Sequence, residues 1–406
     1  MLTAISDSSA MDVNAQTSQT KATDGTLAWL ALVLTPSLGP RRILQAIETV
    51  GGAEALTRCS LTELEALRLP AEAVQFLGTG QGFQAAEQEF TRATEAEVSF
   101  VVYSDDAYPE RLRQIYDPPP VLWVRGDPTL LLRPSIAVVG TRHPTPYGAG
   151  MAEMLARDLA ANGLVILSGM ARGVDTFAHK GALAAGKPTI AVWGTGVDVI
   201  YPKENKSLAE KIIATGGAIV AELPLGTFPA PQNFPRRNRI LSGISVGVLV
   251  VEGGEFSGTR VTARCALEQN REVYAVPGNV TNKQAWGPNT LIKQGARLTA
   301  TWEDVWDDLP TDVRVELADL SIVASPEQVT ASLFDDTAAT AAEESILRVL
   351  RHDEMLQMEE ILDKLEGELS SSEVFTALFE LELAGRIRQL PGKNYVKSFP
   401  QAHTSS

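Results

Sequence analysis

The chain has 406 residues, 44% of them apolar, and a formal net charge of −15 at pH 7. This length suits two or three domains with ordinary hydrophobic cores. Cys59 and Cys265 lie far apart, which favours a reduced cytoplasmic protein over a disulfide scaffold, and no Cys/His/carboxylate cluster has metal-ligand spacing. No apolar run approaches the ~20 residues of a membrane helix. Residues 1–25 are polar and unlike a signal peptide, so we expect a cytoplasmic protein without a membrane partner.

Charge is distributed unevenly along the chain. Residues 134–300 hold 17 Lys/Arg and 11 Asp/Glu, a local balance of +6, which leaves −21 for the remainder. A basic middle between acidic flanks is typical of a protein in which only the middle faces a polyanion. A mildly basic domain without such a partner explains the composition equally well.

The first part of the chain is expected to be a disordered tail, residues 1–25, followed by a helical domain, residues 26–92, in which Pro and Gly interrupt helical apolar spacing. Its centre, "PSLGPRRILQAI" (36–47), resembles the hairpin of a helix-hairpin-helix or SAM-like element. Gly39 would permit the tight turn and the next helix would open at Pro40. Such a hairpin can offer backbone N–H groups to a phosphate, or serve packing alone.

Residues 93–302 alternate short apolar strands with helices, one of them across 148–161. The predicted strands are 121–124, 135–140, 163–169, 189–194, 217–222, 246–252 and 272–278. Continuous apolar strands separated by helices specify a parallel sheet covered on both faces. We therefore predict a doubly wound, mostly parallel α/β fold, in which ligands sit beyond the carboxyl ends of the strands.

The last part of the chain is expected to be an acidic linker, residues 303–342, then a winged-helix domain, residues 343–398, and a tail, residues 399–406. The winged-helix layout rests on three helical stretches and two short strands around Pro391–Gly392. The would-be reading helix, starting near Ser371, carries acids and no cation, and major-groove readers need cations against phosphates. This composition favours contact with protein over DNA reading.

Cations, glycines and aromatics follow the predicted strands at the turns. The candidate site residues are Arg142, Gly169, Arg172, Gly173, Tyr201, Lys203, Lys206, Phe228, Phe234, Arg236, Arg237 and Arg239. One mononucleotide would not need so many separated cations, whereas a strand crossing several phosphates would. Aromatic rings add stacking worth roughly 1–3 kcal/mol per base, so the pattern favours single-stranded nucleic acid.

The arginine trio within "NFPRRNRILSG" (233–243) has a second interpretation, because arginines can also pair with the sheet's own acids. We expect at least one of the three to be structural, and Arg239 is the choice because it lies nearest the helix that "ILSG" begins. Asp175 is expected to be a cap or a loop anchor rather than a catalytic acid.

Two nucleotide-binding motifs are disfavoured. "GTGVDV" has two glycines of a dinucleotide fingerprint, but Val199 replaces the third, and no G-x-x-x-x-G-K-[ST] loop occurs. We therefore expect no cofactor and no metal.

Seven ordered blocks carry a resemblance to a known family. They are "YPERLRQIYDPPPVLWVRGD", "VVGTRHPTPYG", "LSGMARGVDTFAHKGAL", "GTGVDVIYPKEN", "NFPRRNRILSG", "SGTRVTARCALEQNREVYAVPG" and "GPNTLIKQGA". Together they resemble the bacterial DNA-processing protein A (DprA/Smf) family. The resemblance implies a Rossmann-like homodimer that binds single-stranded DNA without sequence preference, protects incoming DNA in natural transformation and helps load the RecA recombinase. It also implies that Arg142, Lys203 and the block from Phe234 to Arg239 line the DNA pocket. Arg260 departs from the family's usual aliphatic residue, and either extends the groove or is simply exposed.

Two other functions compete. Rossmann-like nucleotide hydrolases of the lonely-guy type have a catalytic Glu at the end of a Gly-rich turn, and in "EGGEFSGTRVT" Thr262 stands at that position. Without that carboxylate an enzyme is not expected. A transcriptional regulator acting through the winged helix is disfavoured by its acidic reading helix.

Overall fold

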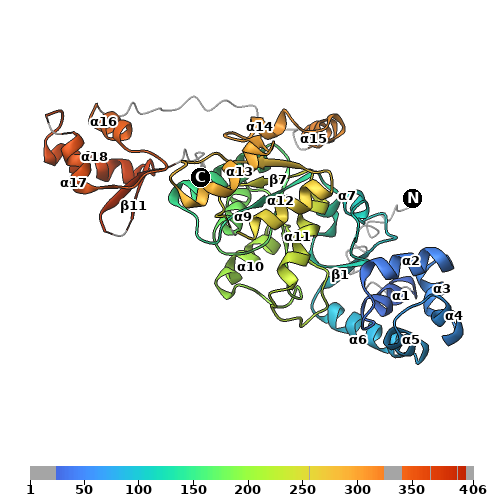
Figure 1. Ribbon diagram of the computed structural model, residues 1–406. Coiled ribbons are helices and arrows are strands. Elements are labelled where there is room, and N and C mark those ends of the chain that lie inside the picture. The colour runs from blue at the N-terminus through green and yellow to red at the C-terminus, as the bar shows by residue number, and fades with distance from the viewer. Residues whose placement is uncertain (1–23, 256, 324–340, 366, 391, 399–406) are drawn as a thin grey trace, which may run out of the picture.

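The computed structural model describes residues 24–255, 257–323, 341–365, 367–390 and 392–398 (Figure 1). It opens with a group of helices: α1 (Asp24–Val33), α2 (Pro40–Val50), α3 (Ala53–Thr57), α4 (Leu61–Ala66), α5 (Ala71–Gly78) and α6 (Gln81–Glu95). Residues 24 and 25 are thus helical, while the rest of the expected N-terminal tail lies outside the described residues.

The turn before α2 differs from expectation. Gly39 has an ordinary φ of −82°, and the left-handed residue is Ser37, with φ 60°.

The centre is one sheet, whose strands are β1 (Val98–Val102), β2 (Val121–Gly126), β3 (Ser135–Val139), β4 (Val165–Ser168), β5 (Thr189–Val192), β6 (Ala218–Ala221), β7 (Gly247–Val250), β8 (Glu272–Ala275) and β9 (Arg297–Leu298). Their order is β1-β2-β6-β5-β4-β3-β7-β8-β9. Strands from β6 to β9 are parallel, and β2 pairs with both β6 and β1 in antiparallel fashion. The doubly wound, mostly parallel sheet is therefore confirmed.

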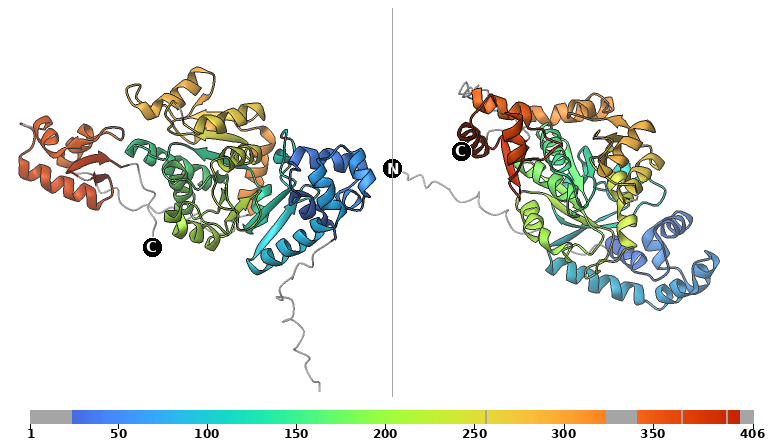
Figure 2. Two further views of the ribbon diagram at one scale, coloured as in Figure 1. Left: turned by 60° about the horizontal axis from the view of Figure 1, so that its bottom comes forward. Right: turned by 60° about the vertical axis from the view of Figure 1, so that its left-hand side comes forward.

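The elements around the sheet are α7 (Glu110–Arg113), η1 (Pro128–Leu132), α8 (Pro146–Ala161), α9 (Val174–Ala184), η2 (Lys203–Asn205), α10 (Lys206–Ala214), α11 (Asn233–Ile244), α12 (Thr259–Glu268), η3 (Lys283–Ala285) and α13 (Trp286–Lys293). Side chains alternate across a strand. Ile136 and Val138 of β3 therefore pack with α8 and α9, whereas Ala137 and Val139 pack with α11 and α12. Figure 2 shows helices on both faces of the sheet.

The N-terminal helices share a core with the sheet. Glu89 of α6, only 4% exposed, accepts hydrogen bonds from the Trp123 indole N–H (2.9 Å) and the Leu225 backbone N–H (2.7 Å). Trp123 lies in the same hydrophobic cluster as Trp29 of α1. The helices α1–α6 and strand β2 are therefore held together by buried contacts.

Residues 303–323 differ from the expected acidic linker. They form α14 (Glu303–Trp306) and α15 (Thr311–Val323), and four apolar side chains of this segment are buried in the core of α8 and α9. The buried residues are Val305, Leu309, Val313 and Leu317. Acids occupy the solvent side, so high charge here marks an amphipathic surface helix. Residues 324–340 lie outside the described residues, as do 399–406.

The remaining elements are α16 (Ala341–Val349), β10 (Leu356–Gln357), α17 (Met358–Lys364), α18 (Ser371–Leu383), β11 (Ile387–Leu390) and β12 (Asn394–Lys397). They form a three-stranded sheet, β10-β12-β11, on a core that includes Ile346, Ile361 and Leu381. This is the winged-helix architecture that was predicted, with β10 as an additional short strand.

Candidate functional site

Strand order creates a crevice at the carboxyl edge of the sheet. From β3 the chain moves outward through β4, β5 and β6, and then returns to β7 on the other side of β3. The loops after β3 and β7 therefore diverge, which is the place where ligands bind in doubly wound sheets. A cavity of about 990 Å³ opens there, lined by residues 139–143, by residues 254, 255, 257–259, 261 and 262, and by one face of α11.

Four of the predicted site residues line this cavity: Arg142, Tyr201, Phe234 and Arg237. The Tyr201 and Phe234 rings lie 5.5 Å apart, and the Arg142 guanidinium lies 6.0 Å from the Phe234 ring. Arg142 is exposed, and no carboxylate in the described part of the chain forms an ion pair with it. A free guanidinium beside two accessible rings is suited to a phosphate and its base.

The stretch "NFPRRNRILSG" belongs to a helix, which corrects the expectation that a helix begins only at "ILSG". α11 starts at Asn233. Pro235, which lacks a backbone N–H, is tolerated in the first turn because an N–H at that position would have no intrahelical partner. Residues three, four and seven apart share a helix face. Phe234, Arg237, Asn238 and Leu241 are spaced in this way and all line the cavity.

Arg237 forms the floor of the crevice and is buried rather than presented to solvent. It is 6% exposed, donates to the Val192 carbonyl at the end of β5, and lies beside the buried Asp175. Burial lowers the pKa of Arg237 to about 10, although Asp175 opposes this shift. Burial likewise raises the pKa of Asp175, while Arg237 opposes it. Arg237 is therefore mainly a buried structural cation, and only a small part of its side chain lines the cavity.

Arg239 is likewise not a free DNA contact. It is 7% exposed, forms an ion pair with Glu222 just after β6, and places its Nε 3.2 Å from Asp117 Oδ2. Arg236 lies on the same side of α11 but is 55% exposed, 4.0 Å from Glu222. The interpretation of Arg239 as a structural arginine thus agrees with its ion pairs.

Gly169 and Gly173 allow close packing in the loop between β4 and α9. A Cβ on Gly169 would lie 2.4 Å from the Arg237 guanidinium, and the Gly169 N–H donates to Asp175 (3.1 Å), so this N–H is not free for a phosphate. Asp175 also accepts from the Ala171 N–H (3.1 Å), as expected of a loop anchor. Gly173 has φ 77°, and a Cβ there would lie 2.4 Å from the Thr141 carbonyl oxygen. It therefore allows the Arg142 loop to approach α9.

The remaining predicted residues lie outside the cavity lining. Arg172 is ion-paired with Glu204, and Lys206 lies 3.9 Å from Glu210. Lys203 is exposed on η2, and Phe228 is 77% exposed in the loop before α11. These side chains do not line the cavity. Arg172 would have to leave Glu204 to reach a phosphate.

Several lining residues were not predicted. The loop after β7 contributes the hydroxyl of Ser257, and the first turn of α12 contributes those of Thr259 and Thr262. The loop after β3 contributes Thr141 and His143. The signal available in the sequence was the position of these loops after β3 and β7, where the strand order reverses. Because strand order is not visible in the sequence, the prediction was based on the cations, glycines and aromatic residues of the turns, and it left out these hydroxyl-bearing residues.

Glu252 and Glu255 both lie near the hydrolase position in the sequence; Glu255 lines the cavity, whereas Glu252 anchors structure. Glu252 is 2% exposed and accepts from the Thr145 N–H (2.8 Å) and hydroxyl (2.6 Å). Burial raises its pKa, and the Thr145 hydrogen bonds oppose this. Thr262 lines the cavity where a hydrolase of this type has its Glu.

The described ranges contain neither a metal-binding cluster nor a membrane-spanning helix. Within them, no group of three His, Cys, Asp or Glu residues is arranged to hold a metal ion. None of the described helices is long and apolar enough to span a membrane.

A doubly wound sheet with a cation- and aromatic-lined crevice at its switch point defines a Rossmann-like protein. The profile of the family described as DNA recombination-mediator protein A matches residues 99–310, and that of the DprA winged helix domain matches residues 330–393. The chain belongs to the DNA recombination-mediator protein A (DprA/Smf) family.

Individual relatives agree with this assignment. Protein Smf of Escherichia coli is 40% identical over 71% of this chain and 75% of its own length. The DNA processing protein DprA of Bacillus subtilis is 44% identical over 52% of this chain and 72% of its own. The X-ray structure of DprA from Streptococcus pneumoniae has a TM-score of 0.60 at 33% identity, covering 71% of this chain and 99% of that one.

Proposed function

We propose that the protein binds single-stranded DNA without sequence preference in DNA processing. The observation that carries the proposal is the crevice with Arg142 unpaired beside the Tyr201–Phe234 ring pair. The names of the relatives, DNA processing protein, support the same class of substrate.

The geometry favours a single strand over a duplex. Stacking on Phe234 and Tyr201 needs bases that are unstacked from their neighbours, which a duplex does not offer. Every base has a π face and every nucleotide a phosphate, so such contacts carry no sequence information. The reading helix of the winged helix, α18, begins with Glu373 in a capping box and offers no cation for a major groove.

Binding rather than catalysis is the proposed activity. Acid–base chemistry on a nucleotide needs a carboxylate directed at the reacting atoms. Thr262 occupies the position where a hydrolase would carry it, and Glu252 is engaged with Thr145. Release of free base from nucleoside monophosphates by the purified protein would contradict this part of the proposal.

The finer proposal is that the protein acts in the cytoplasm as a homodimer, protects incoming DNA in natural transformation and helps load the RecA recombinase. The family description as a recombination mediator supports the RecA partner. The dimer, through the second half of the α/β domain, is proposed on membership of the family rather than on a surface feature of this chain. A monomer in light scattering at micromolar concentration would contradict the dimer.

The test separates phosphate neutralisation from stacking. Arg142→Ala should weaken binding of all single-stranded sequences equally and flatten the log–log salt slope by roughly 0.7 for a lost phosphate contact. Phe234→Ala should weaken binding by about 1–3 kcal/mol and leave the slope nearly unchanged.

The matched control is Arg264→Ala, which removes an exposed arginine paired with Glu268 on α12. It should change neither affinity nor slope. If folded Arg142→Ala protein binds as tightly as wild type with the same slope, the crevice is not the DNA site.

A further inference from the structure

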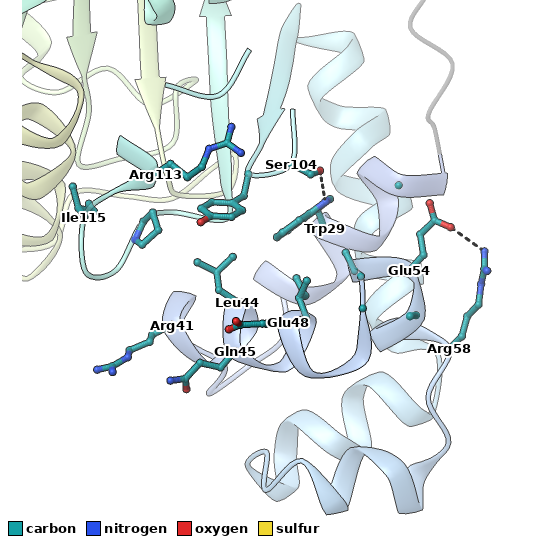
Figure 3. Close-up of a pocket in the computed structure, with 18 of the residues that line it drawn as sticks. Trp29, Arg41, Leu44, Gln45, Glu48, Glu54, Arg58, Ser104, Arg113 and Ile115 are labelled. Carbon is teal, nitrogen blue, oxygen red and sulfur yellow. Dashed lines mark hydrogen bonds and ion pairs between the residues drawn. The ribbon is translucent and has the colours of Figure 1, made fainter. Parts of the chain in front are cut away.

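A second large cavity, of about 1010 Å³, lies between the N-terminal helices and the sheet. Its walls come from α1, α2 and α3 on one side and from the loops after β1 and α7 on the other (Figure 3). Trp29 lies in its middle, where the indole N–H donates to Ser104 (3.2 Å). Figure 3 shows Arg41 near Ile115 at one end, and Glu54 with Arg58 at the other.

At the end of the cavity where Arg41 lies, a guanidinium group is next to an aromatic ring, as Arg142 is next to Phe234 in the main crevice. The Arg41 guanidinium lies 4.0 Å from the centre of the Tyr116 ring, and Tyr116 is 73% exposed. Arg41 and its neighbour Arg42 are exposed, and among the described residues no carboxylate forms an ion pair with either. Arg58, in the same cavity, is by contrast paired with Glu54 (3.3 Å).

Tyr116 is held in place although its ring is exposed. On one side Ile115 is buried in the core that includes Ile244 of α11. On the other side Asp117 pairs with Arg239 of α11, 3.2 Å away. The backbone at Tyr116 is therefore anchored on both sides, and Arg41 lies against the ring, which lowers the entropy that a stacking ligand must remove.

The same loop contacts α11, the helix that lines the DNA crevice. Asp117 contacts Arg239, and Arg236, one helical turn earlier, is the exposed arginine of α11. Asp117, next to Tyr116, thus contacts the side of α11 that carries Arg236 and Arg239, whereas Phe234, Arg237 and Leu241 line the crevice from the opposite side of the same helix. A strand that extends from the crevice to Tyr116 would therefore have to pass around α11 near Arg236.

Charge limits where an anion can sit in the second cavity. Glu48 lies two turns after Arg41 on α2, roughly 10 Å further along the helix. A phosphate is favoured at the Arg41 end and disfavoured deeper in the cavity.

We propose that Arg41 and Tyr116 form a second nucleotide-binding position, which takes a flanking nucleotide of the single strand held in the main crevice. The base stacks on the Arg41 guanidinium plane or the free face of Tyr116, and its phosphate lies beside Arg41 and Arg42. This inference rests on the proposed function and names the path of the strand beyond the crevice.

The experiment uses the full chain and two oligothymidylates, one just long enough to fill the main crevice and one several times longer. Tyr116→Ala should weaken binding of the longer strand by about tenfold and leave binding of the short strand unchanged. Arg41→Gln should also flatten the salt slope for the longer strand by roughly 0.7. Tyr116→Phe keeps the ring and should behave as wild type, as should Arg58→Gln, which changes the paired arginine of the same cavity.

The outcomes separate this inference from the proposed function. Wild-type protein that binds neither strand would refute the proposed function itself. If wild type binds both strands but Tyr116→Ala and Arg41→Gln bind the longer one as tightly as wild type does, the second position is refuted. A lowered Tm with unchanged affinity would likewise refute it, because the pair would then only join α2 to the loop.

Discussion

Three neighbouring arginines of α11 have three different surroundings. Each residue of an α-helix is turned by about 100° from the one before it, so consecutive side chains point in different directions. Arg237 reaches the buried ends of β4 and β5, Arg239 is enclosed by two carboxylates, and Arg236 stays mostly in solvent. Composition identified the cluster as basic, but only the position of the helix decides which of its charges is available to a polyanion.

Arg239→Ala should therefore reduce stability. It would leave the Glu222 carboxylate, 7% exposed, without its close partner, and removing one member of a buried pair typically costs about 3–5 kcal/mol. Arg236→Ala is the control on the same carboxylate, and should cost less than about 1 kcal/mol because Arg236 is half in solvent, lies 4.0 Å from Glu222 and leaves Arg239 paired with it. Urea unfolding midpoints measure both, and equal losses for the two variants would contradict the assignment.

Seven of the nine sheet strands, β2 to β8, were predicted because each is a continuous apolar run, whereas the edge strands β1 and β9 were not predicted. β3 and β7, for example, are buried at every position. Two helices, α11 and α15, were not predicted from the sequence. α11 carries Pro235 and three arginines, which suggest a turn until the proline is placed in the first helical turn. α15 was hidden by acids, although Val313 and Leu317, four apart, already mark an apolar stripe.

The packing of α15, which replaces part of the expected acidic linker, can be tested directly. Leu317 is 2% exposed and Val315, two residues earlier, is 55% exposed. Leu317→Ala should lower the free energy of unfolding by about 2–5 kcal/mol, as for other buried leucines. Val315→Ala should change it by less than about 0.5 kcal/mol, as surface substitutions do. Equal and small effects from both, measured by denaturant unfolding, would mean that α15 does not pack on the sheet.

At the scale of the whole molecule, shared cores decide which parts depend on one another. Trp29 of α1 and Trp123 of β2 lie in one cluster, and Leu317 of α15 lies in another with α8 and α9. A fragment of residues 100–302 would therefore cut β1 and expose both clusters. The winged helix, by contrast, has a cluster of its own.

These cores define the fragment that tests where the DNA site lies. A chain of residues 24–323 keeps both sheet clusters and removes the winged helix, whose α18 begins with a Glu373 capping box. Because every cation and ring proposed to touch DNA lies within 24–323, the fragment should bind oligothymidylate with the affinity and salt slope of the full chain. Filter binding over a salt series measures both quantities. A folded fragment with a much flatter slope would show that phosphates are neutralised by the winged helix, since each lost contact changes the slope by roughly 0.7. Unchanged affinity with lost RecA loading would instead assign the winged helix to a protein partner, as its acidic reading helix favours.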